Sequence, residues 1–435
     1  MLNTRGILVL IAISVAVLSV VLVATCLILF ESESSEPNGK YLIVVSLDGF
    51  RPDYINETIT PNLWKLKREG SFGKMKPMFT SLTFPNHMSI ATGLHEEIHG
   101  VVSNTMYDPK YHEFFQKTND SYLWWDSGYS RPIWVANQIL SKKGHSATIM
   151  WPGCMSTYSG YHSDYQIGFK SSSSEKEMIK TYENHAKQII EWMKDDQKPA
   201  NLVLMYLAEP DQTSHAYPPF SDEVWHAVGL ADQIVGILLN KLIENNLYKS
   251  TNLMVVSDHG MATINESLDL SKTTDMSLYS VEKASTAVLN VWPNEGKLDQ
   301  VYEMFDKLAS EKPFKVYRRD EIPERFRYRH HRRIGELVLV ADDHLELCVK
   351  CWTKPGKTWG NHGYDNDLMD LRALFLGHGP DFQVDFEQNE SFYNVDLYPL
   401  MMRLTNLPRD PRYKHNGTFS VTKKFLRQSL QSYEY

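Results

Sequence analysis

Cysteine is scarce in this sequence, and an excess of positive charge is absent. The chain of 435 residues has 4 cysteines and a formal net charge of -8. Proteins that bind nucleic acid non-specifically usually carry a positive field, so this balance argues against nucleic-acid binding as the main task. The chain also does not have the low hydrophobic content that is typical of disordered proteins. With 42% hydrophobic and 12% aromatic residues, the chain can build a globular core.

The few cysteines form no metal-binding pattern. Cys26 lies in an apolar N-terminal run, which leaves Cys154, Cys348 and Cys351 as an odd set. A zinc knuckle is excluded because no second cysteine pair exists. A bridge between Cys348 and Cys351 needs a turn, since side chains three residues apart on a strand point to opposite faces. The sequence leaves the pairing open.

Long apolar runs are rare, and the one of membrane-spanning length is residues 6–30. It contains no charge and is long enough to cross a hydrocarbon core of roughly 30 Å. Arg5 precedes it and several glutamates follow, which favours a cytoplasmic N-terminus. A cleaved signal peptide is the alternative, but the run exceeds the usual h-region of about 7–15 residues and lacks a clear cleavage site.

This pattern predicts a single-pass type II protein of the cell membrane. A cytoplasmic tip, a signal anchor at about residues 6–30 and a short stalk would occupy residues 1–38, and an extracellular catalytic domain residues 39–435. Extracellular placement predicts N-glycosylation, although each Asn-x-Ser/Thr sequon alone is a weak signal. Five sequons occur, with acceptors Asn56, Asn119, Asn265, Asn389 and Asn416.

Short apolar runs alternate with helical patterns along the rest of the chain. Residues 41–46 have the length and composition of a parallel strand buried on both faces. Similar runs occur at residues 146–150, 201–207, 251–257 and 371–376, and helical patterns at 176–193 and 222–245 separate several of them. This alternation predicts an α/β fold with a mostly parallel central sheet and helices on both faces.

Acidic and imidazole side chains follow three of these strands. Asp48 follows the first, Asp211 the run at 201–207, and Asp258 with His259 the run at 251–257. Ligand sites of such sheets lie outside the carboxyl ends of the strands, so these groups are candidate metal ligands.

The local spacing supports metal binding. Asp211 and His215 are four residues apart, which places them on one side of a helical turn. Asp258 and His259 lie next to Gly260, which lets the backbone approach closely. His362 stands between Asn361 and Gly363 in a tight loop. A lone loop histidine is usually solvated, but beside the other candidates His362 is a further predicted ligand.

A hydroxyl lies at the start of the helix that we expect from residue 83. Thr83 occupies the expected N-cap, Pro85 falls in the first turn, and Gly93 ends the helix. A helix start presents free N–H groups and a positive dipole end, which suits a phosphate. A capping threonine is commonly only structural. The metal ligands expected elsewhere favour Thr83 as a nucleophile.

Two conspicuous motifs are not assigned chemistry. Residues 95–99 spell His-Glu-Glu-Ile-His and match the zincin pattern H-E-x-x-H, but Gly93 and Gly100 leave no room for a long enough helix. Residues 325–333 form a basic run with aromatics. A patch for polyanions is the functional interpretation, and a solvated lid or strand edge is the more common one.

In chain order these motifs resemble the ectonucleotide pyrophosphatase/phosphodiesterase family of the alkaline phosphatase superfamily. The resemblance runs from about Lys40 to about Thr405 and looks like a short member without the cysteine-rich (somatomedin-B-like) or nuclease-like domains. It rests on Val-Ser-Leu-Asp48-Gly-Phe, Thr83-Phe-Pro-Asn-His, Thr92-Gly-Leu to His99-Gly, Asn104, Trp151-Pro-Gly, Glu209-Pro-Asp211 with His215, Ser257-Asp-His-Gly and Asn361-His-Gly-Tyr.

The resemblance implies two zinc ions. One is held by Asp211, His215 and His362, and the other by Asp48, Asp258, His259 and the Thr83 oxygen. A zinc-bound Thr83 hydroxyl would have a lowered pKa, attack phosphorus and form a phospho-threonine intermediate. In the family pattern Asn104 donates to a non-bridging phosphoryl oxygen, whereas as an ordinary asparagine it would make a turn.

The substrate is expected to be a phosphoric diester, because no arginine clamp for a monoester dianion is recognisable near Thr83. In nucleotide-cleaving relatives the base stacks between two aromatic residues, which match Phe84 and Tyr165 here, with Tyr158 and Tyr161 as rivals. We therefore expect hydrolysis of extracellular nucleotides and dinucleoside polyphosphates to nucleoside 5′-monophosphates. Choline diesters or lysophospholipids are the alternative, since aromatic walls also hold cations. A catalytically silent adhesion or receptor module is a third.

Overall fold

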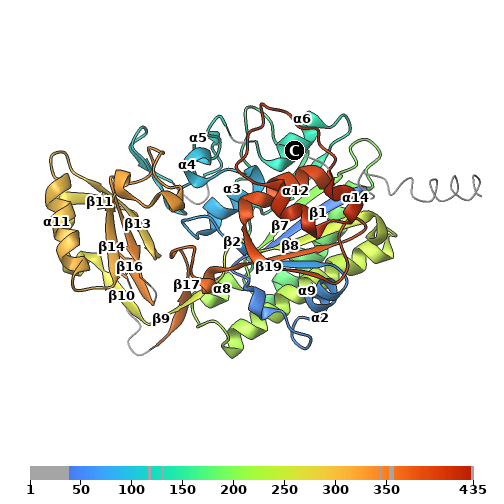
Figure 1. The fold of residues 1–435 in the computed structure, drawn as a ribbon. Coiled ribbons are helices and arrows are strands. Elements are labelled where there is room, and N and C mark those ends of the chain that lie inside the picture. Colours follow the sequence, from blue (N-terminus) through green and yellow to red (C-terminus); the bar gives the residue numbers. More distant parts are fainter. Residues whose placement is uncertain (1–38, 116–118, 130, 343, 352–356, 433–435) are drawn as a thin grey trace, which may run out of the picture.

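The computed structural model describes residues 39–115, 119–129, 131–342, 344–351 and 357–432. The predicted tip, anchor and stalk lie outside the described residues. Two lobes are present, a larger one around a central sheet and a smaller one beside it, on the left of Figure 1.

The central sheet has eight strands in the order β19-β2-β18-β8-β1-β7-β5-β6. Five neighbouring strands run parallel: β8 (Thr251–Val256), β1 (Tyr41–Leu47), β7 (Leu202–Leu207), β5 (Ser146–Ile149) and β6 (Tyr165–Ile167). The strand β18 (Ala373–His378) is antiparallel to β8 and β2 (Ser71–Lys76), and β19 (Phe386–Tyr393) is parallel to β2.

The α/β class is thus confirmed, but the sheet is mixed. The run at residues 371–376 does form a strand, β18, and it enters the sheet in the opposite direction. A strand buried on both faces shows the same continuous apolar run whichever way it points, so its direction is not written in its composition.

Helices cover both faces of the sheet (Figure 1). On one side α2 (Pro61–Arg68) and α7 (Glu175–Met193) pack against α9 (Asp222–Glu244). On the other side α3 (Thr83–Thr92), α6 (Ile133–Leu140) and α12 (Leu397–Leu404) pack together. The face of α9 that carries Val228, Val235 and Leu242 is fully buried, which explains its apolar composition.

Among the residues that the structure describes, α9 is also the one helix long and apolar enough to cross a membrane by length and composition. Most of its residues are buried inside the larger lobe, where it contacts α2 and α7. A core helix passes the same test, so α9 is weak evidence for a membrane span. The sequence predicted no second run of spanning length, whereas α9 has the length and composition of one.

The smaller lobe is built from short strands with a core of its own. One sheet has the order β11-β13-β15-β14, formed by Tyr279–Val281, Val288–Pro293, Leu337–Ala341 and Phe314–Arg318, with α11 (Leu298–Ala309) packed on β14. A second sheet has the order β10-β16-β12, formed by Glu266–Asp269, Leu345–Cys348 and Ser285–Thr286. The sequence did not single out this lobe, because strands this short leave little periodic signal.

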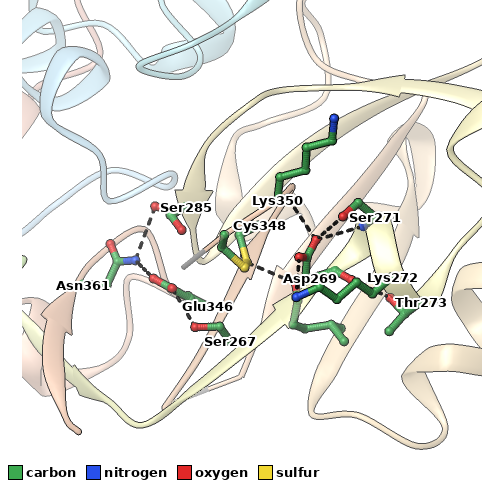
Figure 2. Close-up of a disulfide and its surroundings, with 12 residues drawn as sticks. Ser267, Asp269, Ser271, Lys272, Thr273, Ser285, Glu346, Cys348, Lys350 and Asn361 are labelled. Carbon is green, nitrogen blue, oxygen red and sulfur yellow. Dashed lines mark hydrogen bonds and ion pairs between the residues drawn. A yellow bond between two sulfur atoms is a disulfide. The ribbon is translucent and has the colours of Figure 1, made fainter. Parts of the chain in front are cut away.

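Cys348 and Cys351 form a disulfide at the end of β16 (Figure 2). The chain turns between them because Lys350 adopts a left-handed conformation with φ 56°, and its N–H donates to Asp269 Oδ1 at 2.9 Å. The requirement for a turn is therefore met, and the strand ends at Cys348. Cys154 is a buried free thiol.

Candidate active site

Six predicted ligands converge at the carboxyl ends of the central strands. Asp48 follows β1, Asp258 and His259 follow β8, and Asp211 begins the short helix α8 (Asp211–Ser214) after β7. His215 lies one turn after Asp211, with its N–H bonded to the Asp211 carbonyl. His362 follows β17 (Trp359–Asn361) and arrives from the far end of the chain.

The first group consists of Asp211, His215 and His362. His215 Nε2 lies 3.3 Å from Asp211 Oδ2, and His362 Nε2 lies 3.4 Å from Asp211 Oδ1. The two imidazole Nε2 atoms are 3.3 Å apart. Each of the three residues thus offers one ligand atom, and these atoms lie within 4.8 Å of one another, as around a single metal ion.

The second group consists of Asp48, Asp258 and His259. His259 Nε2 lies 3.4 Å from Asp48 Oδ1 and 3.1 Å from Asp258 Oδ2. Thr83 Oγ1 is 3.4 Å from the same nitrogen, so the hydroxyl faces this group. The rings of His259 and His362 stack with centroids 3.7 Å apart, which places the two groups side by side.

Several carboxylate oxygens in the two ligand groups are buried without a hydrogen bond, which shows whether the groups suit metal ions. Asp48 Oδ1, Asp211 Oδ1 and Asp258 Oδ2 are all buried and have no hydrogen-bond partner. An unsatisfied buried acceptor usually costs about 1–3 kcal/mol, and more when it is charged. All three face imidazole nitrogens across the gaps described above. The residues therefore fit divalent cations, which would satisfy these oxygens.

The electrostatics of the site also favour cations. Burial, together with the charges of Asp258 and Asp211, raises the pKa of Asp48 well above its usual value. For Asp258, burial alone would raise the pKa, but the adjacent imidazoles outweigh it and hold the pKa at about 2. Burial and neighbouring imidazoles lower the pKa of His362 to about 3, so this ring stays neutral and can use a lone pair as a ligand.

Further contacts orient the candidate ligands. His259 Nδ1 lies 2.8 Å from the Gly260 carbonyl and His362 Nδ1 2.9 Å from the Ser81 carbonyl, so each Nδ1–H donates and leaves Nε2 for a metal. Tyr206 Oη donates to Asp48 Oδ2 at 2.5 Å. Sequence analysis missed Tyr206, because it belongs to the uniformly apolar run of β7 and gives no separate signal there.

A tight turn after β1 brings two of these loops together. Gly49 has φ 63°, and its N–H donates to Asp258 Oδ1 at 3.2 Å. A Cβ at this position would lie 3.0 Å from the Asp211 side chain. Both the left-handed backbone and the close approach therefore require glycine here.

Thr83 is the first residue of α3, and Leu82 is the N-cap. The prediction that Thr83 caps the helix is wrong by one position, while Gly93 ends the helix as predicted, in a left-handed conformation with φ 66°. Because Thr83 is the first helical residue and not the cap, its hydroxyl makes no capping bond and faces His259. Asn104 Oδ1 accepts the Phe84 N–H at 2.8 Å, which leaves the Asn104 amide N–H₂ available beside Thr83.

Thr83, Phe84 and Asn104 line a cavity of about 520 Å³ that also reaches both ligand groups. Its other walls are largely apolar, and no lysine or arginine of the described chain lines it. Besides Thr83, Phe84, Asn104, Asp48, Asp211, His215 and His362, the lining residues are Asp120, Trp125, Met150, Trp151, Pro152, Gly153, Cys154, Met155, Phe169, Tyr206, Ala208 and Gln212.

The predicted aromatic partner of Phe84 is not brought to this cavity. Tyr165 stacks on Trp192 with ring centroids 5.1 Å apart, and its hydroxyl donates to the Lys198 carbonyl. Tyr158 is fully buried, with its hydroxyl bonded to the Gly153 carbonyl. Phe169 lines the cavity instead and is 60% exposed. Spacing from the Trp-Pro-Gly motif could not separate these aromatic residues, because the intervening segment forms a strand and loops.

The zincin-like motif lies away from the site. Its helix, α4 (Glu96–His99), is a single turn. Glu96 is buried and accepts from Thr80, and His99 Nε2 lies 3.1 Å from Ser89 Oγ. The rejection of this motif as a metal site is consistent with these contacts.

The basic run at residues 325–333 is mostly neutralised. Arg325 pairs with Asp365 and Asp367, and Arg332 and Arg333 both bind Asp108. Arg333 is nearly fully buried, where it also donates to the carbonyls of residues 100 and 124. These contacts favour a structural clamp over a patch for polyanions.

Comparison with known proteins agrees with the geometry. The family model "Type I phosphodiesterase / nucleotide pyrophosphatase" matches residues 42–365, which is most of the chain. The chain belongs to this family. It is therefore an enzyme of the nucleotide pyrophosphatase/phosphodiesterase class, within the alkaline phosphatase superfamily.

Several relatives in the family match over most of their length. The chain is 35% identical to the mouse bis(5′-adenosyl)-triphosphatase enpp4 over 402 residues, which cover 91% of this chain and 84% of the relative. It is 32% identical to human ectonucleotide pyrophosphatase/phosphodiesterase family member 5 over 405 residues, or 91% and 80% of the two chains.

Solved structures of family member 5 share the fold. The murine protein matches with a TM-score of 0.79 at 32% identity and covers 89% of this chain and 100% of its own. A second murine structure, of an inactive threonine-to-alanine variant in complex with AMP, matches equally well. The family acts on nucleotide and phosphodiester substrates and depends on metal ions, for which the Asp48, Asp258 and His259 group is a candidate site.

Proposed function

We propose that this enzyme hydrolyses nucleotide pyrophosphate and phosphodiester bonds at a two-zinc site and releases nucleoside 5′-monophosphates. Thr83 is the nucleophile, and the product of the first step is a phospho-threonine. The observation that carries the proposal is the pair of ligand groups with unsatisfied carboxylate oxygens beside the Thr83 hydroxyl.

Ligand spacing supports zinc. Bonds of about 2.0–2.1 Å in tetrahedral geometry separate ligand atoms by about 3.3–3.4 Å, whereas octahedral geometry at the same bond length separates neighbours by about 2.9 Å. In the first group, His215 Nε2 lies 3.3 Å from Asp211 Oδ2 and 3.3 Å from His362 Nε2. Mixed imidazole and carboxylate ligands also suit zinc better than magnesium or calcium. Asp211, His215 and His362 would hold one ion, and Asp48, Asp258, His259 and Thr83 the other.

The chain's own groups position the first chemical step. When bound, the zinc ions would lower the pKa of the Thr83 hydroxyl and stabilise charge on the reacting oxygens. Thr83 Oγ1 attacks phosphorus, and the bond to the leaving oxygen breaks on the opposite side. The Asn104 amide, held by the Phe84 N–H, donates to a non-bridging oxygen, and the positive dipole end at the start of α3 favours the bound anion. Water then hydrolyses the phospho-threonine and restores Thr83.

The charge of the cavity supports diester over monoester substrates. A monoester dianion gains from a bidentate arginine, and no arginine or lysine of the described residues lines the cavity. The apolar walls instead leave space for the second substituent of a diester.

Two aromatic residues form the proposed walls of a base subsite, Phe84 and Phe169. A base stacked on an aromatic side chain gains roughly 1–3 kcal/mol. The AMP complex of murine family member 5, which shares the fold, supports a nucleotide as ligand. In this assignment Phe169 takes the role that the sequence suggested for Tyr165.

The Phe169→Ala variant is expected to raise KM for a nucleoside 5′-ester about tenfold or more, because one face of the base loses its stacking partner. The matched control is Tyr165→Ala, which removes an aromatic residue from the same segment outside the cavity and should leave KM unchanged. Steady-state kinetics with thymidine 5′-monophosphate p-nitrophenyl ester measure both. A larger effect of Tyr165→Ala than of Phe169→Ala would contradict the assignment.

A choline-type diester is the second candidate, and Asp120 favours it. This carboxylate lines the same cavity as Phe84, Trp125 and Phe169, and a carboxylate among aromatic rings suits a quaternary ammonium group.

An assay of products separates the two candidates. The purified protein is incubated with ATP, bis(5′-adenosyl) triphosphate and glycerophosphocholine, each with and without a chelator. The proposed function predicts AMP from the first two substrates and loss of turnover with the chelator. Turnover of glycerophosphocholine alone would favour the choline diester. No turnover of any substrate with zinc supplied would favour the silent module.

We also propose that residues 1–38 anchor the enzyme as a type II membrane protein, with residues 39–435 outside the cell as one catalytic unit. The names of the relatives support an extracellular setting, since they describe ectonucleotide enzymes. The five predicted glycan acceptors are all at least partly exposed, as glycosylation requires: Asn56, Asn119, Asn265, Asn389 and Asn416.

A further inference from the structure

A buried carboxyl of the smaller lobe reaches the loop that carries Asn104. Glu282 directly follows β11, and its exposed fraction is 0%. The Ser103 hydroxyl lies 3.1 Å from Glu282 Oε2, and Asn290 Nδ2 donates to Glu282 Oε1 at 3.2 Å. Because Ser103 precedes Asn104 in the chain, this contact links the smaller lobe to the active site.

The same network holds the residue before Ser103. Asn290 Nδ2 also donates to Tyr328 Oη at 3.0 Å, and Tyr328 Oη donates to the Val102 carbonyl at 2.9 Å. Asn290 Oδ1 accepts the N–H of Gly335 at 2.9 Å, so this amide is fixed from both ends. Two successive residues, Val102 and Ser103, are thus each bonded to a side chain from the β11–β15 part of the chain.

Asn104 is therefore held between two supports. On one side its Oδ1 accepts the Phe84 N–H, next to Thr83. On the other side the Ser103 hydroxyl contacts Glu282 and accepts the N–H of Thr105 at 3.3 Å. A shift of about 1 Å at a group that contacts the reacting phosphoryl can cost about 10²-fold in rate.

The polar surroundings of Glu282 contain hydroxyl and amide groups, and no lysine or arginine of the described residues forms an ion pair with it. Burial raises its pKa to about 8, while the bonds to Ser103 and Asn290 oppose this rise. The carboxyl is accordingly mostly protonated at neutral pH. A glutamine has the same shape and can make the same two contacts.

We propose that Glu282 is a positioning residue for phosphodiester hydrolysis, which holds Ser103 and thereby aims the Asn104 amide at the phosphoryl oxygen. The inference rests on the proposed function. It makes the smaller lobe, which contributes no candidate metal ligand from its strands, a necessary part of the active site.

A double-mutant cycle tests the link between Glu282 and Asn104. The probe is thymidine 5′-monophosphate p-nitrophenyl ester, with the zinc-loaded full chain. Glu282→Ala is expected to lower kcat about tenfold, with little change in KM. Asn104→Ala is expected to lower kcat about 10²-fold, because it removes one donor to the phosphoryl oxygen. The double variant should match Asn104→Ala alone, since Glu282 acts only through that amide.

Two further variants separate positioning from general stability. Glu282→Gln should keep kcat within about twofold of the wild type, because its amide preserves both hydrogen bonds. Asp269→Ala removes another buried carboxyl of the smaller lobe, whose contacts with Ser271 and Lys350 stay within that lobe (Figure 2), and should leave kcat unchanged. If Glu282→Ala does not fold, Ser103→Ala combined with Asn104→Ala provides the same cycle.

If the double variant instead loses kcat by the product of the two single losses, Glu282 does not act through Asn104. In an enzyme that is otherwise active, this result would overturn the positioning role and leave the proposed function intact. So would a loss in Glu282→Gln as large as that in Glu282→Ala. A wild-type protein without turnover of any diester would overturn the proposed function, and the inference with it.

Discussion

The Thr83→Ala variant is expected to lose at least about 10⁴-fold in kcat for diester hydrolysis, because it removes the oxygen that bonds to phosphorus in the first step. The hydroxyl is the one group of Thr83 that faces His259, at 3.4 Å, and Thr83 makes no side-chain cap for α3 that its loss would disturb. Steady-state kinetics on ATP and bis(5′-adenosyl) triphosphate give the measurement.

The matched variant is Thr83→Ser, which keeps the nucleophilic oxygen and should retain much of the activity. Acid quenching of the wild type during turnover should also trap a phosphoryl group on Thr83, which mass spectrometry of the tryptic peptide detects. Full turnover by Thr83→Ala, or a phosphoryl group on another residue, would rule out Thr83 as the nucleophile.

Two zinc ions per chain are expected, and each ligand group should lose its ion separately. His362→Ala should remove one equivalent through the first group, and Asp258→Ala one through the second. Either loss should lower kcat about 10³-fold or more, since a catalytic metal supplies several kcal/mol of transition-state stabilisation. Elemental analysis of the purified variants measures zinc, and chelation of the wild type should also lower its Tm because bound metal stabilises the folded state.

A carboxylate and imidazole pair outside the site provides the control for zinc binding. His145 Nδ1 lies 3.0 Å from Asp164 Oδ2 at the edge of the larger lobe, and Asp164 also pairs with Lys198. The Asp164→Ala variant should therefore retain both zinc ions and activity. Zinc content that stays at two equivalents in both His362→Ala and Asp258→Ala would exclude these residues as ligands.

Local pattern was sufficient to predict the class of the fold. Runs such as 201–207 and 251–257 are mostly apolar, and each became a strand buried on both faces, with a ligand residue beyond its end. Local pattern was not sufficient for the direction of β18 or for the smaller lobe. Direction depends on where the chain has travelled between strands, and the lobe is built from short strands that become stable only when packed together.

The candidate site divides in the same way. Asp211 with His215, and Asp258 with His259, are close in the sequence, so their spacing supported shared ligation, although the first pair alone is a weak signal. Tyr206 and Glu282 gave no such signal. Their roles come from contacts with residues far away in the chain, the Asp48 carboxylate and the Ser103 hydroxyl.

By itself, the order of residues determined which side chains are candidate metal ligands and nucleophile, and at which strand ends they occur. Only the tertiary structure decided that Phe169 rather than Tyr165 reaches the cavity, and that the smaller lobe contacts Ser103, the residue before Asn104. The physical reason is the distance along the chain over which each effect acts. Side-chain chemistry and helix or strand period act over a few residues, whereas these contacts depend on how packing closes loops of many residues.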